Sequence, residues 1–193
     1  MFYIPIIGHP SAGKSTLIRL LTGKKVAVGK SSGTTRKINH IQISENVTIL
    51  DFPGYGRLSH RSRSFADFLQ QQTIDYLEEI KSSILVGIVI SDLSNIELVA
   101  NKLDSKGYIP IDYELAEFAL ELSNRTVIVL GNKIDKLTDT TDYNEFINFY
   151  PKDIMFFPVS LKFRKGLEPF LTYLQMVCDD LFDELQSFFW KFT

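Results

Sequence analysis

Residues 5–16 read Pro-Ile-Ile-Gly-His-Pro-Ser-Ala-Gly-Lys-Ser-Thr, and the rest of the chain is organised around this stretch. The apolar run from Met1 to Ile7 predicts a short buried strand, and an amphipathic helix is expected to start at about Lys14. Between them lies Gly-His-Pro-Ser-Ala-Gly-Lys-Ser, which matches the pattern G-x-x-x-x-G-K-[ST] of a phosphate-binding loop. The strand before it and the helix after it are the context that this motif requires.

The spacing of the motif has a physical reason. Gly8 and Gly13 let the backbone turn so that its N–H groups point inward and form a nest for an anion at a helix N-terminus. Lys14 then reaches the β- and γ-phosphates of a nucleoside triphosphate, and the Ser15 hydroxyl is a ligand for Mg²⁺. The expected nucleotide contacts here are Gly8, His9, Pro10, Ser11, Ala12, Gly13, Lys14, Ser15 and Thr16. Taken alone, the motif also fits a glycine-rich turn without any ligand.

Length and composition suit a single globular domain. The chain has 193 residues, 45% of them hydrophobic, and we expect one domain over residues 1–193. The single cysteine excludes a disulfide framework and multi-cysteine metal sites, and the helical spacing of leucines around Cys178 predicts a small core residue. We find no signal peptide, no bilayer-spanning run and no lipidation motif. The expectation is a cytoplasmic monomer that does not bind membranes.

The net charge of −2 is distributed unevenly along the chain. Residues 1–65 contain ten lysines and arginines but only two acidic residues. Residues 66–193 contain eleven lysines and arginines and twenty-one acidic residues. This surplus of positive charge exceeds what one nucleotide needs and leaves room for a polyanionic partner. Acidic helices on the far side that simply balance the sum are an equally good explanation.

Apolar and amphipathic segments alternate along the rest of the chain. Strands are expected at residues 1–7, 38–44, 47–51, 84–90, 126–130 and 154–159, with the second and third paired as a hairpin. Helices are expected from about residue 14, over 65–80, around 115–122, over 143–149 and from 166 to about 191, with a possible short one at 94–100. This alternation predicts an α/β fold in three layers, a six-stranded and mostly parallel sheet with helices on both faces.

Two further phosphate-site motifs follow the first loop. Asp51-Phe52-Pro53-Gly54 ends an apolar strand, so that Asp51 is placed to hold Mg²⁺ through water and the Gly54 N–H to sense the γ-phosphate. In the loop before it, Gly33-Thr34-Thr35-Arg36 offers hydroxyl groups, and Thr35 is the expected second protein ligand of Mg²⁺. Each string is weak alone, but their order and position strengthen them. The predicted catalytic residues are Lys14, Thr35 and Gly54, and the predicted metal ligands are Ser15, Thr35 and Asp51.

The next motif, Asn132-Lys133-Ile134-Asp135, predicts which base is bound. Guanine presents two neighbouring donors, and the Asp135 carboxylate can accept both, whereas adenine would leave it unsatisfied. Asn132 is expected to bond guanine N7, and the Lys133 stem to pack over the ring. After the last strand comes Ser160-Leu161-Lys162, where the Leu161 N–H would meet guanine O6. A turn role for Asn132 and a solvated Lys162 are the alternatives, but the four motifs together predict GTP binding.

This order of motifs resembles the Ras-like GTPase superfamily over the whole chain. More narrowly, the segments 33–36 with Ile38-Asn39, 51–56 and 107–112 resemble the archaeal branch of the EngB family of ribosome-associated GTPases. The resemblance implies a single P-loop NTPase G domain that binds GTP, GDP and Mg²⁺ and hydrolyses GTP as a molecular switch. It further implies a role in assembly of the large ribosomal subunit, with ribosomal RNA in a precursor particle as partner, linked in bacteria to cell division and septation.

Two positions depart from related families. Ser11 stands where potassium-stimulated relatives carry Asn, so we expect little stimulation by K⁺. Tyr55 stands where Ras carries a water-positioning Gln, which predicts slow intrinsic turnover that a partner raises. The loop that contains Gly33-Thr34-Thr35-Arg36 and the loop that follows Gly54 are the two switch loops, which are expected to be ordered by the γ-phosphate and released on hydrolysis. Basic residues in or beside them are expected to face RNA; they are Lys24, Lys25, Lys30, Arg36, Lys37, Arg57, Arg61 and Arg63. The alternative is a regulatory GTPase that acts on protein partners without a ribosomal role.

Overall fold

The elements of the chain follow the expected alternation of strands and helices. The structure, a computed structural model, describes residues 1–23, 38–54, 63–95, 111–122, 126–137, 147 and 150–178. In chain order it has β1 (Phe2–Gly8), α1 (Lys14–Thr22), β2 (Asn39–Gln42), β3 (Val47–Asp51), α2 (Arg63–Ile80), β4 (Gly87–Asp92), α4 (Ile111–Leu122), β5 (Val127–Asn132), β6 (Met155–Val159) and α6 (Leu167–Val177). Short 3₁₀ turns lie at Lys81–Ser83, Leu93–Asn95 and Ile134–Lys136.

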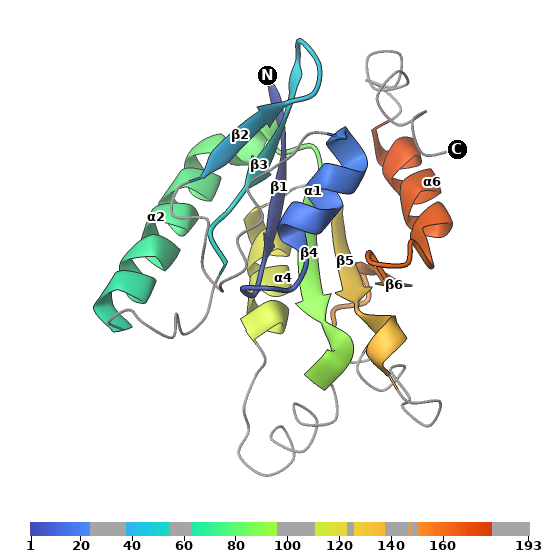
Figure 1. The fold of residues 1–193 in the computed structure, drawn as a ribbon. Coiled ribbons are helices and arrows are strands. Elements are labelled where there is room, and N and C mark those ends of the chain that lie inside the picture. The colour runs from blue at the N-terminus through green and yellow to red at the C-terminus, as the bar shows by residue number, and fades with distance from the viewer. Residues whose placement is uncertain are drawn as a thin grey trace.

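The described strands form a six-stranded sheet in the order β2-β3-β1-β4-β5-β6 (Figure 1). Only β2 is antiparallel, to β3, and the other neighbours are parallel, which confirms the predicted mostly parallel sheet and its hairpin. The carboxyl ends of the parallel strands therefore meet at one edge. There Asp92 pairs with Asn132, and Asn132 pairs with Val159. In open α/β sheets such an edge is where ligands bind.

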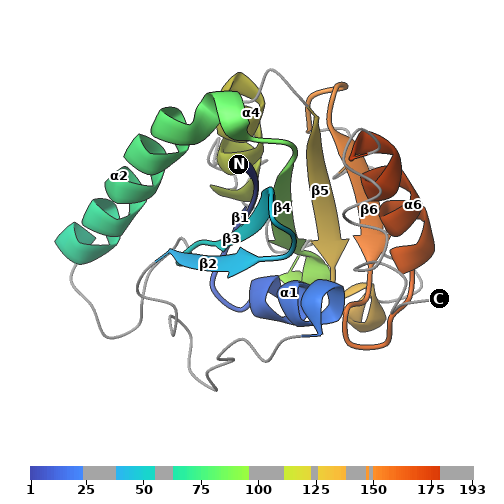
Figure 2. The same ribbon diagram turned by 90° about the horizontal axis from the view of Figure 1, so that it is seen from above.

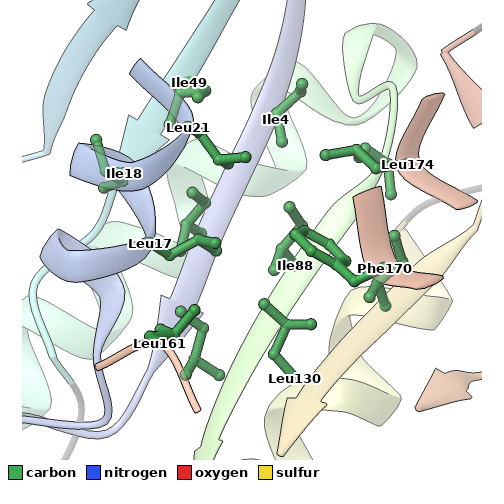
Figure 3. Packing of buried hydrophobic residues seen from close by; sticks show 14 of the residues in the cluster. Ile4, Leu17, Ile18, Leu21, Ile49, Ile88, Leu130, Leu161, Phe170 and Leu174 are labelled. Carbon is green, nitrogen blue, oxygen red and sulfur yellow. The ribbon is translucent and has the colours of Figure 1, made fainter. Parts of the chain in front are cut away.

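Helices cover both faces of the sheet, as predicted. Helices α1 and α6 lie on one face, and α2 and α4 lie on the other (Figure 2). Figure 3 shows the first of the two resulting cores, in which Leu17 of α1 and Phe170 of α6 pack with Ile88 of the central strand. The adjacent residue Val89 points the opposite way and belongs to the second core. Side chains alternate between faces along a strand, so a strand buried on both faces reads as one continuous apolar run.

The observed β4 differs from the expected strand at residues 84–90. It begins at Gly87, because Ile84 pairs only in an isolated bridge with Tyr3, and it continues to Asp92. Strand β5 likewise runs on to Asn132, beyond the expected end at Leu130. In both strands the backbone ladder continues where the side chains become polar. The apolar pattern marks the part of a strand that helices cover, and the polar ends reach beyond it to the ligand edge.

The remaining predictions have mixed outcomes. Strand β2 is shorter than residues 38–44, because the N–H groups of Ile43 and Ser44 turn to bond Val47 O. Cys178 is buried in the first core as expected, and burial raises the pKa of its thiol to about 12. At 94–100 only the end of a 3₁₀ turn is seen, and the rest of that segment, most of 143–149 and everything after 178 lie outside the described residues. No helix among the described residues has the length and apolar character needed to cross a bilayer.

Candidate functional site

The loop between β1 and α1 has the compact turn that the glycine motif predicts. The Ala12 N–H donates to His9 O at 3.2 Å, and Ser11 has a left-handed φ of 64°. Gly13 has a φ of 123°, and a Cβ there would lie 2.4 Å from Asn132 Nδ2. Only glycine fits this position, because a side chain would be both strained and in collision. The tight approach brings the loop against the carboxyl end of β5.

Lys14 is held inside this loop and does not extend into solvent. Its side chain is buried, and Nζ donates to Gly8 O at 2.9 Å and to His9 O at 3.0 Å. The ammonium group therefore sits at the loop itself, where the expected phosphates would lie. Gly54 lies close to it, since a Cβ there would be 3.0 Å from Lys14 Nζ and 2.7 Å from Pro10 Cα. The structure thus brings the first loop and the Asp51–Gly54 motif together.

Asp51, the last residue of β3, carries a buried carboxylate that is only half satisfied. Its Oδ2 accepts a long hydrogen bond of 3.4 Å from Asn39 Nδ2 of β2, and its Oδ1 has no hydrogen-bond partner. Burial raises the pKa of this carboxyl above its ordinary value, although the Asn39 bond and the positive charge of Lys14 act in the opposite direction. Buried polar atoms are nearly always paired, so the free oxygen points to a missing partner.

The donor set around Asp51 fits Mg²⁺. This ion needs only one or two protein oxygens, because waters and substrate phosphates complete its shell. Asp51 supplies a carboxylate, and Ser15, the second residue of α1, supplies a hydroxyl on a partly exposed side chain. In the described ranges no three His, Cys, Asp or Glu side chains form a metal cluster of their own. A metal here would therefore depend on the nucleotide. The proposed third ligand, Thr35, lies outside the described residues together with Gly33 and Thr34.

Asn132, at the end of β5, joins the two halves of the site. Its Nδ2 donates to Ala12 O at 2.6 Å, and its Oδ1 accepts from the Leu161 N–H at 3.0 Å. Asn132 therefore ties the phosphate loop to the loop after β6. Sequence reasoning missed this role, since no local pattern reports a bond between residues 120 positions apart. The same groups were expected to meet guanine N7 and O6, and those two contacts stay predictions.

Asp135 is exposed at the ligand edge, yet its position is fixed. It lies in the 3₁₀ turn Ile134–Lys136, and Ser160 Oγ donates a hydrogen bond to its Oδ1. Ser160 itself is fully buried and follows β6 directly. An exposed carboxylate anchored by a buried hydroxyl is suited to reading a base edge. Lys162, two residues after Ser160, is exposed, as both its expected role and the alternative allow.

Lys133 forms an ion pair that the sequence did not predict. Its backbone has a left-handed φ of 72°, and its Nζ pairs with Asp92 Oδ2 at the end of β4. Asp92 also accepts hydrogen bonds from the Ser94 N–H at 3.0 Å and from Ser94 Oγ at 2.6 Å. Burial alone would raise the pKa of Asp92, but the bonds from Lys133 and Ser94 lower it below its ordinary value. The pair fixes the Lys133 side chain; its packing over a base stays a prediction.

Two residues of the site, Asn39 and Asp92, were not among the sequence-predicted ones. Asp92 has a usable signal, since an acidic residue follows the apolar run of a central strand with only Ser91 between them. Asn39 has none, because its bond to Asp51 depends on the register of the β2–β3 hairpin. Apart from residues 33–35, the predicted site residues come together at the carboxyl edge of the sheet.

Comparisons with known proteins identify a family of GTPases. A family model described as "50S ribosome-binding GTPase" matches residues 3–133. A probable GTP-binding protein EngB of Methanosarcina barkeri is 36% identical over 139 residues, covering 72% of this chain and 66% of that protein, just under two thirds of its length. A probable EngB of Pyrococcus horikoshii is 33% identical over 177 residues, covering 87% and 80%.

A solved structure gives the same result. The crystal structure of a probable GTP-binding protein EngB superposes with a TM-score of 0.77 at 31% identity, covering 92% of this chain and 99% of that one. The two chains are therefore alike in both fold and sequence, and the family model spans more than half of this chain. With a phosphate loop, a half-satisfied acidic residue and a guanine-type motif on one sheet edge, the chain belongs to the EngB family of Ras-like P-loop GTPases.

Proposed function

We propose that this chain is a cytoplasmic molecular switch, a single G domain that binds GTP with Mg²⁺ and hydrolyses it to GDP and phosphate. The observation that carries the proposal is the presence of two carboxylates, one at each end of the site, along the same sheet edge. Asp51 is buried beside Lys14 with one free oxygen, and Asp135 is exposed at the base end and anchored by Ser160. A metal–phosphate complex and a guanine base would complete these two ends of the site.

Hydrolysis of GTP requires mainly that the reacting groups are positioned and that the developing negative charge is stabilised. Lys14 and the loop N–H groups hold the phosphates, and Ser15, Thr35 and Asp51 would hold the metal. When bound, Mg²⁺ neutralises the charge that develops on the phosphate oxygens. The Gly54 N–H meets the γ-phosphate and reports its loss. Since Tyr55 is not a Gln and a phenol is a poor general base at neutral pH, hydrolysis is slow until a partner orients the water.

Base choice tests the nucleotide part of this proposal. Asp135→Asn replaces an acceptor by a donor where guanine presents its amino group. GTP affinity should fall by about tenfold or more, and xanthosine triphosphate, which has a carbonyl there, should bind better than to the wild type. Competition against a fluorescent GTP analogue measures both. Unchanged GTP binding by the variant would show that Asp135 does not read the base.

We further propose that the switch acts in assembly of the large ribosomal subunit, with a link to cell division and septation. The matching family of 50S ribosome-binding GTPases and the basic N-terminal third of the chain support an RNA-rich partner. Most of the basic switch-loop residues lie outside the described residues, so the RNA-facing surface that they would form is inferred from the sequence alone. Co-sedimentation with large-subunit precursor particles, compared in GTP-like and GDP states, is the direct test. Association that ignores the nucleotide, or is absent, would favour a GTPase that acts on protein partners.

A further inference from the structure

The loop after β6 is a rigid turn that projects from the ligand edge. Its ends are closed by two backbone hydrogen bonds, from the Ser160 N–H to Lys165 O at 3.0 Å and from the Lys165 N–H to Ser160 O at 3.1 Å. The Phe163 N–H donates to Ser160 Oγ at 3.3 Å. The base of the loop is anchored by Leu161, whose side chain lies in the core beneath α1 (Figure 3). The backbone that carries Phe163 is therefore fixed before any partner binds.

Phe163, within this turn, is exposed in a way that no other described aromatic residue is. Its side chain is 55% exposed, whereas every other phenylalanine, tyrosine or tryptophan whose burial the structure describes is half-buried or buried. Lys162 Nζ lies 4.7 Å from the centre of its ring. Arg164 and Lys165, on its other side, are exposed. Arg164 adopts a left-handed φ of 56°, a conformation that favours glycine, so the arginine occupies this position against its backbone preference.

A cavity of about 600 Å³ adjoins this turn. Its described lining holds three cationic side chains, Arg19 of α1 with Lys162 and Arg164, and no carboxylate; Thr16, Leu20, Gly23 and Leu161 complete it. Because Thr16, Leu161 and Lys162 are also expected nucleotide contacts, the cavity borders the nucleotide site, and Arg19 and Arg164 are the cations that the nucleotide leaves available. The only ion pair found among the described residues is that of Lys133 and Asp92, so none of these three cations is neutralised by an acidic side chain there. A hollow lined by these three positive charges beside an exposed ring is suited to a ligand that has both phosphates and flat bases.

We infer that this turn and cavity bind single-stranded RNA. An unpaired base stacks on Phe163, and the phosphates of the same strand lie against Arg19, Arg164 and Lys165. Base–aromatic stacking and a positively charged groove are the two components of such binding, and every base offers a face to the ring. A protein partner fits less well, because one exposed aromatic ring among four cations gives only a small apolar area to bury. The inference rests on the proposed ribosomal role and adds a contact surface outside the two switch loops.

The same turn is connected to the nucleotide site. Ser160 Oγ, which accepts from the Phe163 N–H, also donates to Asp135, and the Leu161 N–H donates to Asn132. Lys162 belongs to both surfaces and is therefore unsuitable for a selective variant. Phe163, Arg164 and Arg19 make no expected contact with the nucleotide. Substitutions there separate RNA binding from GTP binding.

The test measures binding of a fluorescein-labelled, unstructured RNA of about twelve nucleotides to the full chain in its GDP form, by fluorescence anisotropy. Phe163→Ala should weaken binding about tenfold, and Phe163→Trp should restore it, since a stacked base contributes mainly through the ring. Met176→Ala is the matched control, because Met176 is 62% exposed on α6 and its removal costs a similar exposed apolar side chain. GDP affinity and thermal melting of each variant verify that it is folded.

Salt dependence supplies a second measurement. Arg164→Gln should lower the slope of log affinity against log salt by about 0.7, the loss of one contact to a single-stranded phosphate. Unchanged RNA affinity in Phe163→Ala, or an unchanged slope in Arg164→Gln, overturns the inference. If Phe163→Ala lowers particle association but not RNA affinity, the surface binds protein and the inference also fails. A wild type that binds the RNA but never a ribosomal particle refutes the ribosomal role and leaves the loop assignment standing.

Discussion

Asp51 is a residue at which stability is expected to oppose function. Its carboxylate is fully buried, one oxygen is unpartnered, and burial is the main cause of its raised pKa. Asp51→Asn removes the buried charge, so the nucleotide-free protein should gain about 1–2 kcal/mol of unfolding free energy at neutral pH. The same substitution removes the carboxylate proposed for Mg²⁺. Denaturant unfolding of the two proteins measures the gain.

The pH dependence of that gain has a definite sign. The folded-state pKa of Asp51 is raised from 3.8. Between the unfolded-state and folded-state pKa values, the folded protein therefore keeps a proton that the unfolded chain has already released. The stability that protonated Asp51 contributes is therefore present below pH 3.8 and is lost as the pH rises through the folded-state value. Wild type and Asp51→Asn should match in acid and diverge towards neutral pH. A variant that is less stable than the wild type at neutral pH would contradict this account.

Asp92 should behave in the opposite way. Its pKa is lowered by Lys133 and Ser94 in spite of burial, so the folded state holds fewer protons than the unfolded chain. The ion pair thus stabilises above pH 3.8 and ceases to do so as the pH falls through the lowered folded-state value. Asp92→Asn should cost about 1 kcal/mol at neutral pH, since both side chains are partly solvated, and nothing in strong acid. Asp153→Asn, at an exposed carboxylate in the turn before β6, is the control and should change little at either pH.

At the scale of elements, the close packing of the phosphate loop on β5 is the feature most sensitive to substitution. A methyl group at Gly13 would meet Asn132 Nδ2 at 2.4 Å and push apart the elements that Asn132 joins. Gly23, at the end of the same helix, also has a positive φ, of 63°, but an added Cβ there meets nothing within 4 Å. The two positions therefore separate collision from backbone strain.

Gly13→Ala and Gly23→Ala form a matched pair of variants. Gly23→Ala should cost about 1 kcal/mol of unfolding free energy through backbone strain alone and leave GTP affinity nearly unchanged. Gly13→Ala adds the collision, so it should cost about 1–3 kcal/mol more and weaken GTP binding at least tenfold. Chemical denaturation and nucleotide titration measure the two effects. Equal losses in both variants would mean that the contact with Asn132 has no role in binding.

At the scale of the whole molecule, the sequence predicts those features that depend on hydrophobic periodicity and on motif spacing, namely the order of the elements and the strand ends that carry the site. The continuous apolar runs predict doubly covered strands, and the motif positions at strand ends place Asp51 and Asn132 on one edge. The extent of β4 to Asp92 was not predicted, because hydrophobicity reports helix cover while the ladder depends on the backbone of a neighbour. The bonds of Asn132 to Ala12 and Leu161 were not predicted either, since they join segments that only the closed sheet brings together.

A bound nucleotide should stabilise the whole sheet, because its expected contacts come from both halves of it. The phosphate loop follows β1, Asp51 ends β3, Asn132 ends β5 and Ser160 follows β6. A ligand that binds only the folded state adds about 2.7 kcal/mol at a hundredfold excess over its Kd. With a non-hydrolysable GTP analogue and Mg²⁺, this corresponds to a rise in Tm of about 5–10 °C. One cooperative transition is expected, since no strand of the site can open without losing the ligand.

Removing the metal should then distinguish the nucleotide's own contribution from that of Mg²⁺. In the wild type, EDTA should reverse part of the Tm rise, because the analogue's phosphates and the unpartnered Asp51 oxygen lose the ion between them. In Asp51→Asn the rise should be smaller from the start, and EDTA should change it little. Asp153→Asn should respond to EDTA as the wild type does, since its exposed carboxylate lies away from the site. An undiminished EDTA effect in Asp51→Asn would mean that other ligands hold the metal, and that the free oxygen of Asp51 has a different partner.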